Sequence, residues 1–284
     1  VELINNHSNI VRISKNDRLL LEKEIKIEEY NKITKAKASL SINKILEFAN
    51  EIEIAEVNEL IEAQMESNLK IAEEGLANDY GLNIGSTILN SESRSLKSIL
   101  KAYAAAGSDA RMSGSLLAVV INSGSGNQGL TASVPVIKFA EHFNIKREKL
   151  IRALVLSNLT AIHIKNEIGI LSAYCGAVSA AAASGAAFSY LKGGGYKEIS
   201  DTIVNTLGNV SGIICDGAKA SCAAKIASSV DAAVLAHDLT MSNQRMSAEE
   251  GIVKKDIEET IKAVGQIGSI GMEKTDEEIL KIML

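Results

Sequence analysis

Alternating apolar and polar residues mark the first part of the chain. Residues 1–7, 9–14 and 18–25 show this alternation, and turn-forming polar residues separate them. A period of two is typical of β-strands with one buried face. The pattern predicts two or three short strands. We therefore interpret residues 1–30 as a β segment that ends an N-terminal domain.

From about Ser39 onward, apolar residues recur every three or four positions, which predicts amphipathic helices. The first two cover residues 42–49 and 60–72, the second with Glu and Asn on its opposite face. Further helices are predicted over residues 87–105, 129–143, 149–165, 173–190, 196–210, 218–239, 247–264 and 276–283. The predicted fold is mainly α: a compact multi-helix domain over residues 31–284, preceded by the short β segment, which is expected to continue a missing N-terminal region.

Composition supports this fold and narrows the class of partner. The chain has 284 residues, 46% of them hydrophobic, and a formal net charge of −5. No basic excess exists to neutralise a phosphate backbone, so no nucleic-acid partner is expected. A single proline and abundant alanine favour long, closely packed helices.

Neither a membrane nor an oxidising compartment is indicated. The apolar runs at residues 115–121 and 177–188 are too short to span a bilayer, so no membrane partner is expected. Three cysteines are too few for a disulfide framework, and no signal peptide is recognisable. A cytoplasmic location is the prediction.

A loop rich in glycine and serine follows the apolar run at residues 116–121. Its residues are Ser123, Gly124, Ser125, Gly126, Asn127, Gln128 and Gly129. Glycines let backbone amides turn toward one point, and the helix that follows adds free N–H groups and the positive end of its dipole. The loop therefore favours an anion, either a carboxylate or a phosphate. A flexible turn without a ligand is the alternative.

Two cationic residues, Arg111 and Lys165, lie in segments that differ from an ordinary solvent-exposed helix face. Arg111 could clamp a carboxylate through two parallel hydrogen bonds. Lys165 could provide a second anion contact or carry a proton. Surface cations at helix ends are an equally good interpretation of both residues.

The three cysteines, Cys175, Cys215 and Cys222, lie in surroundings that are rich in glycine and alanine and low in charge. A glycine turn between Cys215 and Cys222 allows both sulfurs to point toward one site near a positive helix end. Three thiolates suit an iron–sulfur cluster with one iron left open. A zinc site completed by His163 or His237 is the competing metal interpretation. A lone cysteine such as Cys175 would otherwise be an inert core residue.

Four motifs, taken in chain order, resemble one family. They are DARMSG at residues 109–114, INSGSGNQGL at 121–130, KNEIGILSAYCGAVSAAAASGAA at 165–187 and GIICDGAKASCAAK at 212–225. This ordered set resembles the anaerobic L-cysteine desulfidases, a group related to the alpha chains of iron–sulfur L-serine dehydratases. The resemblance covers most of the chain.

The resemblance implies a [4Fe–4S] enzyme whose cluster cysteines fall on Cys175, Cys215 and Cys222. The open iron would act as a Lewis acid on the leaving thiol or hydroxyl of a small amino-acid substrate. Loss of the α-proton and of that group, then hydrolysis of the enamine, would give pyruvate and ammonia, with sulfide when the substrate is cysteine. A homodimer is a candidate assembly.

The sequence departs from the family at the catalytic base. Members carry a further cysteine, proposed as the base, in an N-terminal region that this sequence does not contain, and no cysteine precedes Cys175. The strand-like start at Val1 favours a piece of a longer protein. Within the chain, Lys165 is the first candidate for the base, ahead of Lys219 and His163.

Four functions are compatible with these features. Cysteine degradation is preferred, because GSGNQG and CDGAKASC resemble the desulfidases more than the dehydratases. L-serine dehydration is the nearest alternative. A non-catalytic helical domain that binds a carboxylate through the glycine loop and a structural zinc domain belong to other classes.

Overall fold

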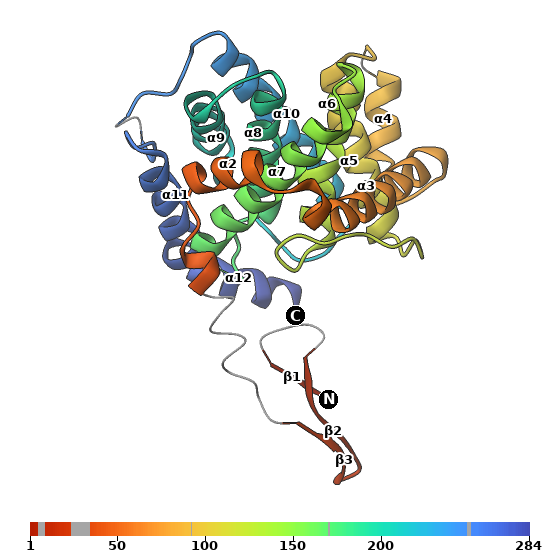
Figure 1. Cartoon of the computed structure of the whole chain (residues 1–284). Coiled ribbons are helices and arrows are strands. Elements are labelled where there is room, and N and C mark those ends of the chain that lie inside the picture. Colours follow the sequence, from red (N-terminus) through yellow and green to blue (C-terminus); the bar gives the residue numbers. More distant parts are fainter. Residues whose placement is uncertain (5–8, 24–34, 92, 170, 249–250) are drawn as a thin grey trace. The chain divides into compact units, whose positions relative to one another are not determined.

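The structure is a computed structural model that describes residues 1–4, 9–23, 35–91, 93–169, 171–248 and 251–284. The chain divides into two units, Val1–Leu40 and Ser41–Leu284. The predicted domain boundary at residues 30 and 31 lies outside the described residues. The prediction of a mainly α fold with a small β segment is confirmed (Figure 1).

The first unit contains a three-stranded antiparallel sheet in the order β1 (Glu2–Leu3), β2 (Ile10–Lys15) and β3 (Arg18–Glu22). Asn16 and Asp17 join the second and third strands with φ of 47° and 64°. Two consecutive residues with positive φ match the turn that continues the natural twist of a hairpin, and Asn and Asp tolerate this conformation. Local turn chemistry thus sets the register of this sheet.

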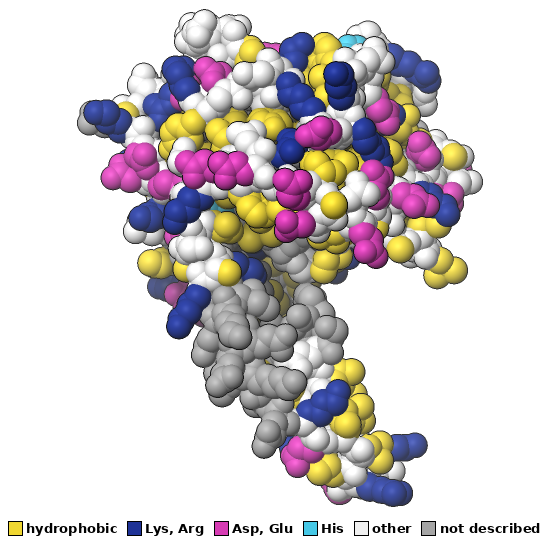
Figure 2. All heavy atoms as spheres, viewed as in Figure 1, with side chains coloured by type: hydrophobic (Ala, Val, Ile, Leu, Met, Phe, Trp, Pro, Cys, Tyr) yellow, Lys and Arg dark blue, Asp and Glu magenta, His cyan; other side chains and the backbone are white. Residues whose placement is uncertain are grey.

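The second unit is built from helices. In chain order they are α2 (Ile42–Glu51), α3 (Ile54–Ala77), α4 (Ile84–Ser91), α5 (Leu96–Met112), α6 (Gly126–His142), α7 (Arg147–Ile168), α8 (Gly176–Leu191), α9 (Tyr196–Val210), α10 (Cys222–Met241), α11 (Ile257–Gln266), the π-helical turn η1 (Ile267–Gly271) and α12 (Glu273–Met283). No described helix combines the length and the apolar character that crossing a bilayer requires. Acidic and basic side chains alternate over the visible face of this unit (Figure 2).

Helix α8 forms the centre of the helical unit. It packs against α6, α7, α9 and α10, and nearly all of its residues are buried. Alanine, serine and glycine make up most of its sequence, so neighbouring helices approach it closely. A Cβ added to Gly185 would lie only 3.2 Å from the Cβ of Ala233 in α10. The small residues therefore determine how tightly the core closes.

Two predicted helices differ from the structure. The prediction of one helix over residues 87–105 is wrong, because α4 ends at Ser91 and α5 begins at Leu96. Ser95 caps α5, its Oγ accepting a hydrogen bond from the N–H of Ser98 at 3.2 Å. A hydroxyl that satisfies the first turn in this way starts a new helix. The predicted helix over residues 247–264 also begins later, at Ile257.

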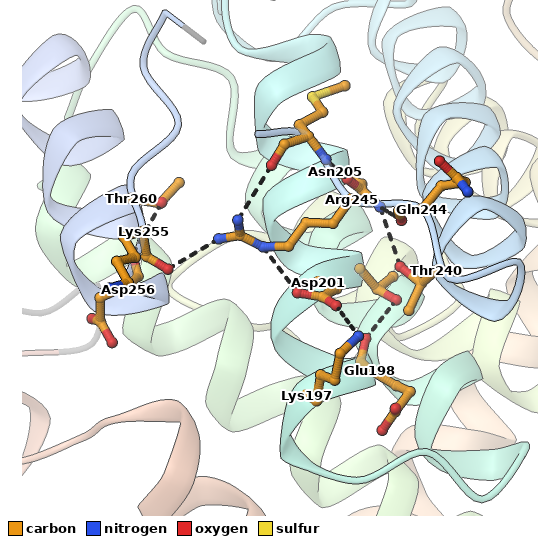
Figure 3. A network of polar contacts seen from close by, with 12 residues as sticks. Lys197, Glu198, Asp201, Asn205, Thr240, Gln244, Arg245, Lys255, Asp256 and Thr260 are labelled. Carbon is orange, nitrogen blue, oxygen red and sulfur yellow. Dashed lines mark hydrogen bonds and ion pairs between the residues drawn. The ribbon is translucent and has the colours of Figure 1, made fainter. Parts of the chain in front are cut away.

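An arginine attaches the segment after α10 to α9 and to the start of α11 (Figure 3). The Arg245 Nε lies 2.9 Å from the Asp201 carboxylate of α9. Its other nitrogens donate to the backbone oxygens of Met246 at 3.3 Å, Lys254 at 3.0 Å and Lys255 at 3.2 Å. One guanidinium thus pairs with three backbone oxygens that lie outside the helices.

A second set of bonds reinforces this attachment (Figure 3). The Asn205 side-chain amide donates to Thr240 Oγ1 at 3.2 Å and to the Gln244 oxygen at 3.0 Å. Its own oxygen accepts from the N–H of Met246 at 2.9 Å. The chain reversal after α10 is therefore held by side chains rather than by regular secondary structure.

We predict that Arg245→Ala lowers the free energy of unfolding by about 2–3 kcal/mol, because it leaves the Asp201 carboxylate with one exposed partner. That side chain is only 9% exposed, whereas its remaining partner, Lys197, is 69% exposed. Urea denaturation followed by circular dichroism measures the change. Arg147→Ala, which removes a pair with Glu62 at the surface, is the matched control and should change the value by less than about 1 kcal/mol. Equal losses in both variants would contradict the prediction.

Candidate functional site

A short antiparallel pairing brings two of the cysteines together. Tyr174 and Ile214 form an isolated β-bridge. On either side of it, the Cys175 N–H donates to the Ile213 oxygen at 3.0 Å, and the Cys215 N–H donates to the Ala173 oxygen at 2.6 Å. Cys175 is then the N-cap residue of α8. Backbone hydrogen bonds thus hold two distant segments in register, with their cysteines adjacent.

The thiols of Cys175 and Cys215 share a hydrogen bond, which polarises both groups. This bond, together with burial, raises the pKa of Cys175. The same bond lowers the pKa of Cys215 to about 6, and the nearby Lys225 and Lys165 contribute to that decrease. Cys175 therefore holds its proton more firmly, and Cys215 is the better acceptor of the shared hydrogen bond.

Cys222 completes the group at the start of α10. Its Sγ accepts from the N–H of Lys219 at 3.5 Å and donates to the oxygen of Gly217 at 3.6 Å. A thiolate at Cys222 would raise the pKa of Cys175, so the charge of either residue reaches the other. Cys222 thus lies near Cys175, which itself adjoins Cys215.

The segment between Cys215 and Cys222 is closed by a turn and an ion pair. Gly217 has a φ of +89°, a conformation that side chains other than glycine rarely adopt. Asp216 pairs with Lys225 across this turn. These contacts fix the conformation of the chain between the two cysteines.

The described residues contain no group of three His, Cys, Asp or Glu side chains arranged to hold one metal ion. The two histidines considered as zinc ligands are engaged elsewhere. His163 pairs with Glu258 at 2.6 Å, and His237 Nδ1 contacts Ser189 Oγ at 2.9 Å. Burial lowers the pKa of His237 to about 4, so it is a neutral core residue. The zinc alternative is not supported by this geometry.

Lys165 lies in the last turn of α7 beside the cysteines. Lys165 is only 8% exposed. Burial lowers the pKa of its ammonium group, whereas the charges of Cys215 and Cys175 act in the opposite direction. A lysine in this position places a positive charge, or a neutral amine, next to two sulfurs.

The glycine loop is a tight turn followed directly by a helix. Ser123 and Gly124 have φ of 49° and 78°. Asn122 and Ser125 flank them and exchange two backbone hydrogen bonds at 3.1 and 2.9 Å. Ser125 caps α6, its Oγ accepting from the N–H of Gln128 at 3.4 Å. The predicted loop is thus half turn and half first helical turn, which puts the N-terminus of α6 inside the loop.

Arg111 and Gln128 connect this loop to its surroundings. Arg111 Nη1 lies 3.5 Å from Asn127 Oδ1, and a Cβ on Gly126 would lie 2.2 Å from Arg111 Nε. On the other side, a Cβ on Gly176 would lie 2.5 Å from the Gln128 amide carbon. Since Gly176 directly follows Cys175, the first turns of α6 and α8 touch. The loop, the predicted arginine and the cysteines therefore form one continuous region.

Comparison with known proteins identifies the family. The family model described as "Serine dehydratase alpha chain" matches residues 15–281. The chain belongs to the serine dehydratase alpha chain family. No solved structure matches the chain.

Similar proteins carry the name "UPF0597 protein". One from Lachnoclostridium phytofermentans is 52% identical over 284 residues, which are 100% of this chain and 68% of the relative. One from Treponema denticola is 48% identical over 288 residues, covering 100% of this chain and 67% of the relative. A third, from Desulfitobacterium hafniense, is 49% identical over 278 residues, 98% of this chain and 64% of the relative. The chain thus spans about two thirds of the length of these relatives.

In this serine dehydratase alpha chain family member, buried amides on α3 position the segment before the glycine loop. Asn68 Oδ1 accepts from the N–H of Val120 at 2.9 Å, and its Nδ2 donates to Ser133 Oγ at 2.9 Å. Asn68 is fully buried, whereas Leu60 on the same helix is 63% exposed. The prediction that the asparagines of this helix lie on the face opposite its apolar residues is therefore wrong for Asn68.

A second series of hydrogen-bonded side-chain amides reaches the glycine loop itself. Gln64 and Asn158 exchange two side-chain hydrogen bonds, at 3.0 and 2.7 Å. Asn122 donates to Asn158 Oδ1 at 3.0 Å, and its own oxygen accepts from Ser123 Oγ at 2.9 Å. The role of these amides was not predicted from the sequence. A polar residue between apolar neighbours in a predicted helix, such as Gln64 before Met65, is the signal that could have indicated it.

We predict that Gly129→Ala destabilises the protein by about 2 kcal/mol or more, because its new Cβ would lie 2.1 Å from the backbone oxygen of Val120. A backbone oxygen cannot rotate away as a side chain can. Gly271→Ala is the control, since the nearest atom to its Cβ is 3.8 Å away. Urea denaturation should show a loss only for Gly129→Ala. Unchanged stability of that variant would mean that the packing between the loop and α6 is loose.

Proposed function

We propose that this protein is an iron–sulfur lyase that eliminates the thiol or hydroxyl group of a small β-substituted amino acid, with L-cysteine as the preferred substrate. Membership of the serine dehydratase alpha chain family supports a lyase related to serine dehydratases. The observation that carries the proposal is the convergence of Cys175, Cys215 and Cys222 beside the N-terminus of α6. L-serine is the alternative substrate, which the family description favours.

The donor set fits a [4Fe–4S] cluster. Cysteine thiolates are the usual ligands of such clusters. Lys225 acts on Cys215 as a positive charge that favours its thiolate form. A cluster held by three cysteines would supply, through its remaining iron, a Lewis acid for the leaving group.

The glycine loop and Arg111 are proposed to bind the substrate carboxylate. The N–H groups at the α6 N-terminus and the positive end of the helix dipole attract an anion. Arg111, held against Gly126, adds a charged donor at the same point. Asn68 on α3 and Asn158 on α7 keep the glycine loop rigid, since their side-chain oxygens accept hydrogen bonds from Val120 and Asn122 just before it.

Lys165 is proposed to accept the α-proton of the substrate. A general base must be neutral before it acts, and burial favours the neutral form of a lysine. Its position beside Cys175 and Cys215 puts it where the leaving group would be activated. The proton and the leaving group depart from adjacent carbons, so the proton acceptor and the group that activates the leaving group must lie near each other.

We predict that Cys175→Ser, Cys215→Ser and Cys222→Ser each lose most of the bound iron and the release of pyruvate. Purification without oxygen, followed by iron and sulfide analysis and visible absorption, measures the first loss. Assays with L-cysteine and L-serine measure the second. Met246→Leu is the control, because it removes a sulfur that packs against Gly208 in α9. A colourless wild-type protein with stoichiometric zinc would overturn the cluster proposal.

We predict that Lys165→Met keeps its iron yet releases pyruvate about 10²- to 10⁴-fold more slowly, because the proton acceptor is gone. Exchange of the substrate α-proton with deuterated solvent, followed by NMR, should slow to the same extent. Lys219→Met and His163→Gln remove the two other candidates for the base and should leave α-proton exchange nearly unchanged. An unaltered exchange rate in Lys165→Met would exclude Lys165 as the base.

A further inference from the structure

The side-chain oxygen of Gln128 is a buried acceptor that receives no hydrogen bond. Gln128 is 7% exposed, and no described group donates to its Oε1. Its amide lies against the first turn of α8, where a Cβ on Gly176 would be 2.9 Å from this oxygen. The unpaired acceptor is therefore at the contact between the glycine loop and the Cys175 segment.

An unpaired acceptor in such a position is unfavourable unless a ligand pairs with it. Leaving a buried amide oxygen without a donor costs the full desolvation of that group. An apolar side chain of similar size, such as methionine, would avoid this loss. Each buried unpaired group in a folded protein thus requires an explanation, and a ligand that brings a donor is one.

Charge decides which ligand group suits this oxygen. Arg111 is a cation on the loop side, where it contacts Asn127. A guanidinium attracts a carboxylate and repels an ammonium group. The Gln128 oxygen is a neutral acceptor on the Cys175 side of the loop, against Gly176, so it suits the ammonium end of a zwitterion whose carboxylate is bound by the α6 N-terminus and Arg111.

We propose that Gln128 Oε1 accepts a hydrogen bond from the α-ammonium group of the substrate and so selects α-amino acids over acids that lack this group. The proposal rests on the proposed function, because it assumes that an amino acid occupies the glycine loop. It assigns Gln128 a role in specificity that differs from the carboxylate role of the loop amides. A site built around a polar partner rejects analogues that lack that partner, since its own group then stays unpaired.

The test compares L-alanine with propionate as inhibitors of cysteine turnover by the full chain, with its cluster assembled without oxygen. The two molecules differ by the ammonium group, and neither has a leaving group. Wild-type protein should bind L-alanine more tightly than propionate. In Gln128→Met the ratio of the two inhibition constants should fall at least about tenfold, whereas Gln128→Glu, which keeps an acceptor, should retain the preference. Gln266→Met, a glutamine at an exposed position, is the matched control.

A second measurement applies even if Gln128→Met does not fold. In isotope-labelled wild-type protein, the side-chain amide signals of Gln128 should shift with L-alanine and not with propionate. An unchanged inhibition ratio in Gln128→Met, or equal shifts with both compounds, would overturn the role of Gln128. Absence of pyruvate release from either cysteine or serine by the wild-type protein would instead refute the proposed function, so the two failures are distinguishable.

Discussion

The close packing of small residues around α8 is the constraint on which the site depends. This helix is buried among α6, α7, α9 and α10, and its alanines, serines and glycines allow the backbones to come near one another. At Gly176, a Cβ would lie 2.5 Å from the amide carbon of Gln128, so a larger residue there would displace that side chain. Since α8 begins immediately after Cys175, its packing also determines where the first cysteine lies. A bulkier helix would separate the glycine loop from the cysteines.

Electrostatics in the site follow from burial and from the unequal sharing of protons. Cys175 and Cys215 are equivalent in chemistry but not in surroundings. The hydrogen bond between them and the nearby lysines lower the pKa of Cys215, whereas burial and neighbouring negative charge raise the pKa of Cys175. Two opposing effects also act on the pKa of Lys165: burial lowers it, whereas negative charge on Cys215 and Cys175 raises it. Such a group of coupled sites is a good candidate for ligand binding and proton transfer.

The glycine loop is rigid although glycine is flexible. Its turn is closed by two backbone hydrogen bonds, and amide side chains from α3 and α7 hold the residues before it. A preorganised loop loses little entropy when it binds a small ligand, which is the advantage of fixing it in advance. The amide contacts therefore serve the same purpose as the small residues of α8, because both fix the position of the α6 N-terminus.

The sequence by itself determined the features that depend on neighbouring residues: the helical periodicity, the hairpin turn at Asn16 and Asp17, and the glycine-rich turn at the start of α6, although α6 begins at Gly126 and not at residue 129. Motif order also indicated the three cysteines and the loop, whose chemical roles remain predictions. Only the tertiary structure decided that the β-bridge between Tyr174 and Ile214 places Cys175 beside Cys215, that Asn68 is buried, and that Gln128 faces Gly176. These contacts join residues far apart in the chain, and local patterns carry no information about such distances. Burial of a polar side chain such as Asn68 is favourable only where a distant partner, here Val120 and Ser133, completes its hydrogen bonds, and that partner is supplied by the fold.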